Sequence, residues 1–175
     1  MGRPNKKPKK PDRNKRYMNG RQFEREILGL HEMPKFKISR GDFTLEVCLI
    51  NAVLAQPKDH DFRNPTAEWL VAIKRGVEKI IESEVLVYIC VGLPVDFLKS
   101  VDLFVVSMEH RSFVTIDLTT YPESPSKADV KFTPAEKESE NFSLFCQFVA
   151  SGLAANTNRM TERMFQAILQ NKLPV

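Results

Sequence analysis

The sequence is poor in the residues that mark several common functional classes. Only seven of its 175 residues are glycine, and none falls in the GxGxxG or GxxxxGK spacing of a phosphate-binding loop. This disfavours nucleotide-dependent chemistry of those types. The three cysteines form no CxxC pair, so neither a disulfide framework nor a zinc site is indicated. We expect them to be reduced core thiols of an intracellular protein.

Long apolar runs are also missing. No stretch approaches the roughly 18 to 20 consecutive apolar residues that a membrane-spanning helix needs. The basic start of the chain is not followed by the apolar core of a signal peptide. We therefore expect no membrane partner and an intracellular location, either cytoplasmic or, in a eukaryotic host, nuclear.

Positive charge is concentrated at the start of the chain. Residues 1–21 contain nine basic residues and one acid, whereas the whole chain has a net charge of +4, so the rest of the chain is net acidic. Because this segment has almost no apolar residues, we expect residues 1–21 to be a disordered basic tail. Residues 22–175 are long enough for a single globular domain.

The tail predicts a polyanionic partner, and nucleic acid is the first choice because short Lys/Arg arms bind phosphates through counterion release. An import receptor, another protein partner or a purely solubilising role are the alternatives. The expected nucleic-acid-binding residues are Lys6, Lys7, Lys9, Lys10, Arg13, Lys15 and Arg16.

Apolar periodicity predicts the order of the elements after the tail. Short helices are expected around Phe23–Leu30 and Leu45–Ala52, and a long amphipathic helix from Pro65 to about Ser83, with Asn64 as its cap. The run VLVYICVGL reads as a strand buried on both faces. A hairpin follows, then a polar loop, then two more helices. This order favours an α+β or a three-layer α/β fold.

The hairpin, SVDLFVVSMEHRSFVTIDLTT (residues 100–120), carries two carboxylates among apolar residues. A turn centred on Glu109 and His110 places Asp102 directly opposite Asp117, on the same face of the sheet. Opposed residues have β-carbons about 4.5 to 5.5 Å apart, where two like charges destabilise the pair. A proton, a nearby Lys or Arg, or a divalent cation is expected to neutralise them. Alternatively, both carboxylates lie at a solvent-exposed rim of the sheet.

The expected elements are, in order, a long helix, a strand, an apolar strand that opens with an aspartate, a hairpin return that ends in an acid, and a further helix. This order resembles that of the PD-(D/E)XK nuclease superfamily. The resemblance covers roughly residues 65–154. Val101-Asp102 matches its first element, with valine in place of proline, and Asp117-Leu118-Thr119 its second, with threonine in place of lysine.

The resemblance implies a restriction-endonuclease-like core, with a small mixed sheet of three or more strands flanked by helices. It implies that Asp102 and Asp117 bind Mg²⁺ or Mn²⁺, and that a lysine orients the attacking water. Lys127 or Lys131 is expected to replace the missing lysine if the loop folds back. A helix glutamate, Glu78, is a further candidate ligand, although its spacing from Lys74 also fits an ordinary helix ion pair.

Two functions follow from these observations. The first is a metal-dependent nuclease, or a nuclease-like nucleic-acid-binding protein, that hydrolyses phosphodiester bonds. The second is a non-catalytic interaction protein on a degenerate nuclease-like scaffold, which the threonine at position 119 and the acidic body favour.

Overall fold

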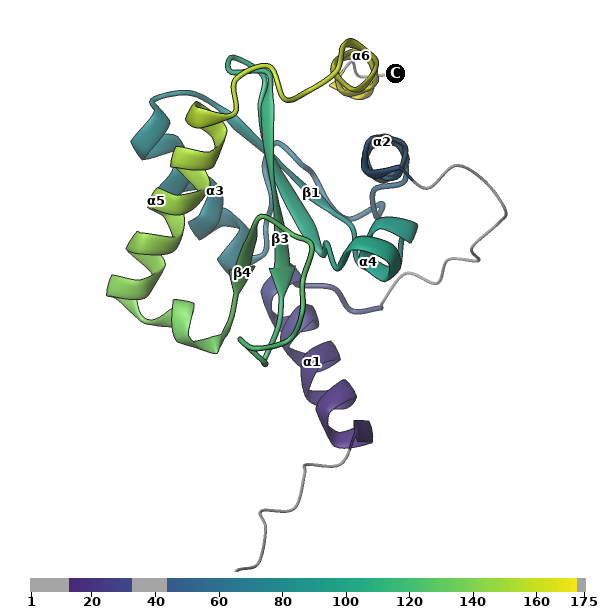
Figure 1. Ribbon diagram of the computed structural model, residues 1–175, viewed down its shortest axis with the longest axis vertical. Helices are drawn as coiled ribbons and strands as arrows, with labels where there is room; N and C mark the ends of the chain where they lie inside the picture. Colours follow the sequence, from purple (N-terminus) through teal and green to yellow (C-terminus); the bar gives the residue numbers. More distant parts are fainter. Residues whose placement is uncertain (1–12, 33–43, 173–175) are drawn as a thin grey trace, which may run out of the picture.

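The computed structural model describes residues 13–32 and 44–172 of the chain. In these ranges helices surround one small sheet (Figure 1). The helices are α1 (Arg13–Leu28), α2 (Leu45–Leu54), α3 (Glu68–Ile81), α4 (Pro94–Lys99), α5 (Ser139–Ala155) and α6 (Glu162–Lys172), with a 3₁₀ turn, η1 (Pro134–Lys137), before α5. The strands are β1 (Val85–Ile89), β2 (Leu103–Ser107), β3 (Ser112–Leu118) and β4 (Val130–Phe132).

The sheet has the strand order β1-β2-β3-β4. The first three strands form an antiparallel meander, and β4 runs parallel to β3. The hairpin register predicted from its turn is confirmed, because Ser107 opposes Ser112 and Leu103 opposes Ile116. Strand β4 lies inside the segment that was predicted as a loop, since a strand of three residues is too short to show an alternating pattern.

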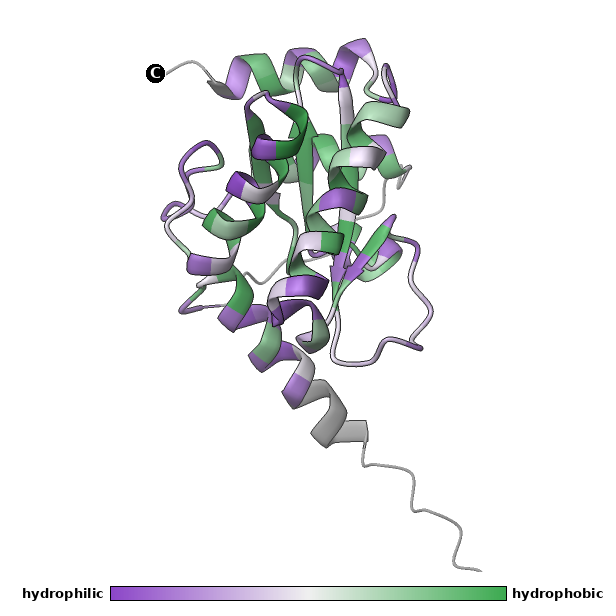
Figure 2. Cartoon of the chain, turned by 90° about the vertical axis from the view of Figure 1, so that its left-hand side faces the viewer, coloured by the Kyte–Doolittle hydropathy of each residue, from purple (hydrophilic) through white to green (hydrophobic). Residues whose placement is uncertain are grey.

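Helices cover both faces of the sheet. Helices α3 and α5 pack on one face, while α2, α4 and α6 lie on the other (Figure 1). All five residues of β1 are buried, which confirms a strand buried on both faces. In Figure 2 the central strands are green, and purple polar positions lie on outer turns and in loops. The predicted mixture of helices and a small mixed sheet is therefore confirmed.

Helix α3 begins three residues later than predicted, at Glu68. The Asn64–Pro65 pair does not cap it, because the backbone N–H of Asn64 bonds the carboxylate of Asp61 in a local turn, at 3.1 Å. At Gly76 the helix approaches α5 so closely that an added Cβ would lie 2.5 Å from Cys146 Sγ. The absence of a side chain at this position therefore sets the distance between the two helices.

Side chains bond the backbone groups at the outer edge of β1. Lys74 donates to the carbonyl of Val85, and Glu78 accepts from the N–H of the same residue at 3.0 Å. At the other end of the strand the Gln56 amide bonds both backbone groups of Ile89. These bonds leave no template for an additional strand at those positions.

The predicted boundary of the basic tail is wrong. Helix α1 begins at Arg13, so residues 13–21 are helical rather than disordered. Arg, Lys, Met and Gln all have good helix propensity, which allows the helix to extend backwards from its apolar turn around Phe23. Residues 1–12 lie outside the described part of the chain. None of the described helices is long and apolar enough to cross a bilayer.

Candidate functional site

Asp102 and Asp117 meet at the end of the β2–β3 hairpin. The backbone N–H of Asp102 donates to the carbonyl of Ile116 at 2.9 Å, and its Oδ2 accepts the N–H of Leu118 at 2.6 Å. Each carboxyl group also affects the pKa of the other. Both residues are buried, with 3% and 7% of their surfaces exposed. The alternative of a solvent-exposed rim is therefore wrong.

The surroundings of Asp102 and Asp117 change the acidity of both carboxyl groups. Burial raises the pKa of Asp102 well above its usual range, and the nearby carboxylates of Asp96 and Glu24 raise it further. Burial also raises the pKa of Asp117, although hydrogen bonds from Ser126 and Asp102 oppose the shift. Both shifts favour the protonated forms of the two carboxyl groups, and protonation reduces the repulsion between them.

The pair lies in a cleft of about 320 Å³ whose wall includes two further carboxyl groups. Glu24 comes from α1 and Asp96 from α4, so elements far apart in sequence bring four acids to one end of the sheet. Sequence reasoning missed both. Glu24 had a weak signal, because it lies one helical turn before the buried Leu28 and therefore on the inner side of α1. Asp96 had none, since α4 was not predicted.

Arg21 partly balances the charge of this cleft. Its Nη1 lies 2.9 Å from Glu24 Oε2 and 3.9 Å from Asp96 Oδ2. Burial nevertheless outweighs Arg21 and raises the pKa of Glu24 to about 7. Burial also raises the pKa of Asp96, against the opposing effect of the Gly92 N–H, which donates to it at 2.8 Å. In this cleft Glu24 therefore takes up a proton near neutral pH.

Lys131 lies beside Asp117 on the neighbouring strand. The two residues are partners in the parallel β3–β4 ladder, so their side chains project from the same face of the sheet. The positive charge of Lys131 opposes the rise in the pKa of Asp117. Its Nζ donates to the carbonyls of Pro122, at 2.7 Å, and Ser124. Of the two predicted replacement lysines, the structure brings Lys131 to the aspartate pair.

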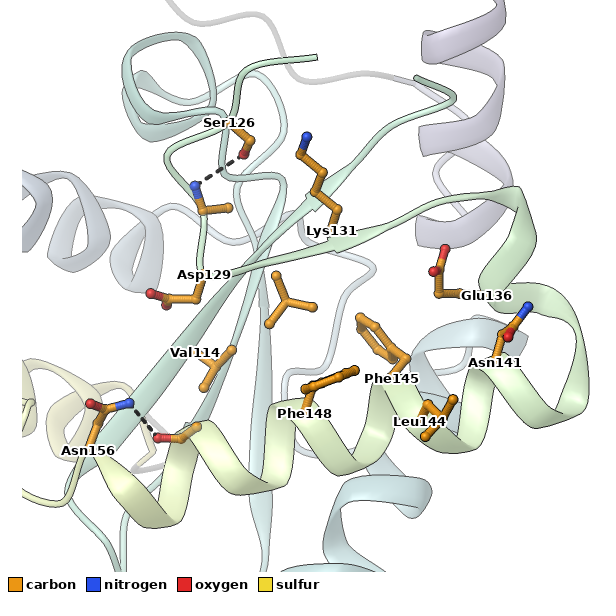
Figure 3. A pocket seen from close by; sticks show the side chains of 13 residues that line it. Val114, Ser126, Asp129, Lys131, Glu136, Asn141, Leu144, Phe145, Phe148 and Asn156 are labelled. Carbon is orange, nitrogen blue, oxygen red and sulfur yellow. Dashed lines mark hydrogen bonds between the residues drawn. The ribbon is translucent and has the colours of Figure 1, made fainter. Parts of the chain in front are cut away.

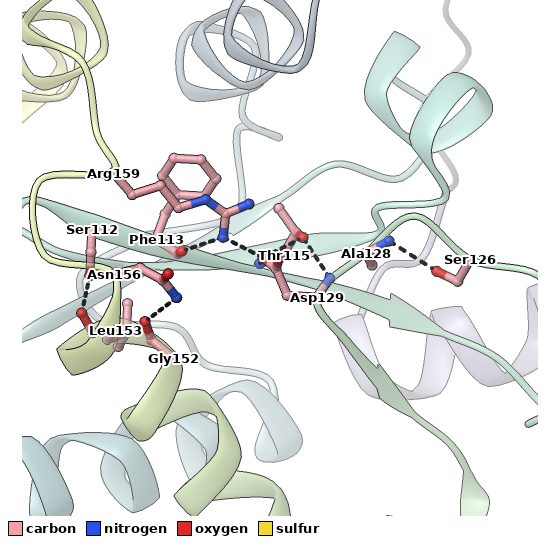
Figure 4. A network of polar contacts seen from close by, with 10 residues as sticks. All are labelled: Ser112, Phe113, Thr115, Ser126, Ala128, Asp129, Gly152, Leu153, Asn156 and Arg159. Carbon is pink, nitrogen blue, oxygen red and sulfur yellow. Dashed lines mark hydrogen bonds and ion pairs between the residues drawn. The ribbon is translucent and has the colours of Figure 1, made fainter.

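A network around Asp129 fixes the register of β4 and hence the place of Lys131. Asp129 Oδ2 accepts the backbone N–H and the hydroxyl of Thr115, each at 2.8 Å (Figure 4). Arg159 bonds the same oxygen at 2.6 Å and the carbonyl of Phe113 at 3.0 Å. These bonds cover the part of the β3 edge that β4 does not reach.

The other predicted site residues lie elsewhere or have different contacts. Lys127 is exposed and does not line the cleft. Glu78 bonds Lys74 and Val85 at the far end of β1, so the prediction that it ligates a metal with the aspartates is not supported by its position. Thr119 accepts the N–H of Tyr121 at 3.1 Å, which organises the loop after β3.

The tail residues are only partly described. Lys6, Lys7, Lys9 and Lys10 fall outside the described ranges, whereas Arg13, Lys15 and Arg16 belong to the first turns of α1. Helix α1 projects from the body of the molecule below the sheet (Figure 1). These turns therefore belong to the same helix that contributes Glu24 to the cleft.

The donor atoms of the cleft are carboxylate oxygens, which Mg²⁺ and Mn²⁺ prefer. Within the described ranges, no three His, Cys, Asp or Glu residues are grouped so as to hold a metal ion together. A cation here would bind one or two carboxylates and complete its shell with water and phosphate oxygens, as Mg²⁺ commonly does. Asp102 and Asp117 fit that mode.

A larger cavity, of about 730 Å³, lies between α5 and the β3–β4 edge (Figure 3). Its wall includes the side chains of Leu144, Phe145 and Phe148. Its acids already have partners, since Asp129 bonds Arg159 and Glu136 caps η1. The cavity is therefore mainly apolar, and the acidic cleft is the better candidate for chemistry.

Comparisons with protein-family models, with curated proteins and with solved structures gave no match to this chain.

Proposed function

We propose that the protein is a metal-dependent nuclease, or a nuclease-like nucleic-acid-binding protein, with a restriction-endonuclease-like core. The proposal rests chiefly on one observation: Asp102, Asp117 and Lys131 lie together at one end of the sheet, beside a cleft that contains two more acids. Two carboxylates with a lysine on a neighbouring strand are the groups that the resemblance requires, although the lysine is not at its usual position.

The topology supports the same proposal. A helix precedes three antiparallel strands, a fourth strand pairs in parallel with the third, and helices cover both faces. Asp102 stands directly before the second strand and Asp117 near the end of the third, in agreement with the order of elements that the resemblance implies. The difference is that a loop and strand β4 lie between β3 and helix α5, where the resemblance places the helix directly after the hairpin.

Asp102 and Asp117 are the proposed ligands of Mg²⁺ or Mn²⁺. A bound divalent cation would lower the pKa of a coordinated water and stabilise negative charge on a phosphate. Because the pKa values of Asp102 and Asp117 are raised, protons compete with a cation for these carboxyl groups. The affinity for the cation is therefore expected to rise with pH.

Lys131 is the proposed replacement for the lysine of the family. Its ammonium group is the cation placed in register with Asp117, and it would orient the attacking water or hold a phosphate oxygen. For this it must exchange its bonds to the carbonyls of Pro122 and Ser124. The basic residues before Gly20 would bind the flanking phosphates without sequence preference.

Cleavage of plasmid, single-stranded DNA and RNA with Mg²⁺ or Mn²⁺ tests the proposal. Asp117→Asn should reduce cleavage by about 100-fold or more, because it removes a ligand of the ion that stabilises the developing charge. Lys131→Met should reduce it by about 100-fold, whereas Lys127→Met, the matched control on the same loop, should leave the rate of cleavage within twofold. Equal cleavage by wild type and Asp117→Asn would remove the nuclease proposal.

One observation favours the second candidate, a non-catalytic interaction protein. Thr119, at the usual lysine position, bonds within its own loop, and Lys131 is engaged by carbonyl groups. If the chain binds nucleic acid but cuts none of the three substrates, the cleft is degenerate. Binding that depends on the basic residues would then define the function, and a chain lacking residues 1–12 should lose most of its affinity at low salt.

A further inference from the structure

The solvent-facing side of helix α5 carries almost no charge. Residues 141–158 include no Asp, Glu, Lys or Arg, although 27% of the residues of the chain are charged. On α3, which packs on the same face of the sheet, Arg75 and Lys79 are exposed. The exposed face of a helix on a soluble domain is ordinarily charged or polar. Depletion of charged residues is instead typical of the centre of a protein–protein interface.

Two large apolar side chains lie on this uncharged side. Leu144 and Phe148 are 51% and 66% exposed, and their spacing of one helical turn makes them neighbours. Both border the cavity of about 730 Å³, whose apolar wall continues to Val114 and Val130 (Figure 3). These four residues form the α5 face, which extends from the helix to the edge of the sheet at β4. Contiguous apolar surface of this kind marks interaction sites.

The charged groups at the cavity already have partners within the chain. Asp129 bonds Arg159, Glu136 caps η1, and Lys131 donates to two backbone carbonyls. The α5 face therefore offers little to a charged partner. Residues 1–12, with five Lys or Arg residues, are chemically unsuited to cover it. The occupant that fits is itself uncharged and apolar.

A second copy of the chain presents that surface. In a two-fold symmetric dimer the same patch meets itself, so Phe148 of each copy would lie over the cavity of the other. A small ligand would fill the cavity but leave the outer sides of Leu144 and Phe148 in water. Helix α5 has 17 residues, about 25 Å. Two such faces, each about 20 Å wide with the cavity included, would bury about 1,000 Å² in total, enough for a weak specific dimer.

We propose that the α5 face is the interface of a homodimer in solution. The two copies pack α5 against α5 across a two-fold axis, and Phe148 of each copy covers the cavity beside α5 of the other. The acidic cleft takes no part, because none of the residues that line it lines this cavity. The inference is therefore independent of the proposed function. The small area predicts a dissociation constant on the order of micromolar.

Sedimentation velocity between about 1 and about 200 µM tests the inference. The wild type should pass from monomer to dimer over this range. Phe148→Ser should raise the dissociation constant about 100-fold or more, because an aromatic side chain at the centre of the interface is lost twice in a symmetric dimer. Phe97→Ser is the matched control, since it removes a phenylalanine that is 52% exposed on α4. It should dimerise within twofold of wild type.

A wild type that stays monomeric at the highest concentration overturns the inference and leaves the α5 face to a different protein. Equal dimerisation of wild type and Phe148→Ser also overturns it. If Phe148→Ser does not fold, Leu144→Asp decides by the same criterion. A chain that lacks residues 1–12 should dimerise as wild type does. If only the shortened chain dimerises, that segment rather than a second copy is the natural occupant, and the inference fails.

Discussion

Replacing Glu24 by glutamine should stabilise the protein at alkaline pH and leave its stability almost unchanged at acidic pH. Glu24 is the cleft acid that α1 contributes, and burial is the largest cause of its raised pKa. Glutamine has nearly the same shape and can still accept a bond from Arg21. The substitution therefore removes the ionisable proton with little change in packing.

The pKa of Glu24 sets the pH range and the size of the effect. The pKa is 4.5 in an unperturbed glutamate and about 7 in the folded protein. Below pH 4.5 the carboxyl group is neutral in both states. As the pH rises from 4.5 to about 7, the unfolded chain loses this proton before the folded one, so stability falls. At 1.36 kcal/mol per pKa unit, the complete loss is about 3 kcal/mol.

Urea unfolding at pH 5 and pH 8 measures this effect. Glu24→Gln should be only about 1 kcal/mol more stable than wild type at pH 5 and about 3 kcal/mol more stable at pH 8. Glu26→Gln, on the exposed side of the same helix, should show no such dependence on pH. A Glu24→Gln protein that gains nothing between pH 5 and pH 8, or is less stable than wild type at pH 8, would refute the reasoning.

Three further substitutions, measured by urea unfolding, test contacts that hold the helices and the edge strands of the sheet in place. Gly76→Ala should cost about 1–3 kcal/mol, since the new methyl group would lie 2.5 Å from Cys146 Sγ. Gln56→Leu should cost about 2 kcal/mol, because it leaves two backbone groups of β1 unpaired. Burial raises the pKa of Asp129, but bonds from Arg159 and Thr115 outweigh it and hold that pKa below the usual value. Asp129→Asn should therefore cost about 1–3 kcal/mol at pH 7 and less as the pH falls below 3.8.

The hairpin could be predicted from the sequence because its signals are local. Alternation assigned the faces of both strands, and the polar turn around Glu109 fixed the register that opposes Ser107 to Ser112. The same register brought Asp102 to Asp117. A one-residue slip would have placed the two carboxylates on opposite faces, and the observed register, which continues to the bond from Asp102 N–H to the carbonyl of Ile116, agrees with the predicted pairing.

The rest of the cleft could not be predicted, because it depends on contacts between distant segments. Glu24 and Asp96 meet through the packing of α1 and α4 at one end of the sheet, which no local pattern encodes. The position of Lys131 depends on β4, a strand of three residues that Asp129 holds in register. Glu78 was predicted as a metal ligand from the sequence, but in the structure it accepts the N–H of Val85 at the edge of β1 instead.

The cleft also shows why a buried hairpin tolerates two carboxylates. Burial favours the protonated form of Asp102, which reduces the charge of the pair, and the backbone N–H of Leu118 donates to its Oδ2. The raised pKa of Glu24 nevertheless means that the cleft lowers the stability of the fold above neutral pH. Groups that reduce stability in this way are frequent at functional sites.

The melting temperature at pH 8, measured with increasing MgCl₂ or MnCl₂, tests most directly whether the aspartate pair is a cation site. At a cation concentration ten times the dissociation constant, wild type should gain about 1.4 kcal/mol, or about 3–6 °C for a chain of this size. Asp117→Asn should gain nothing over the same range. Equal increases in both proteins, or no increase in wild type, would contradict the account.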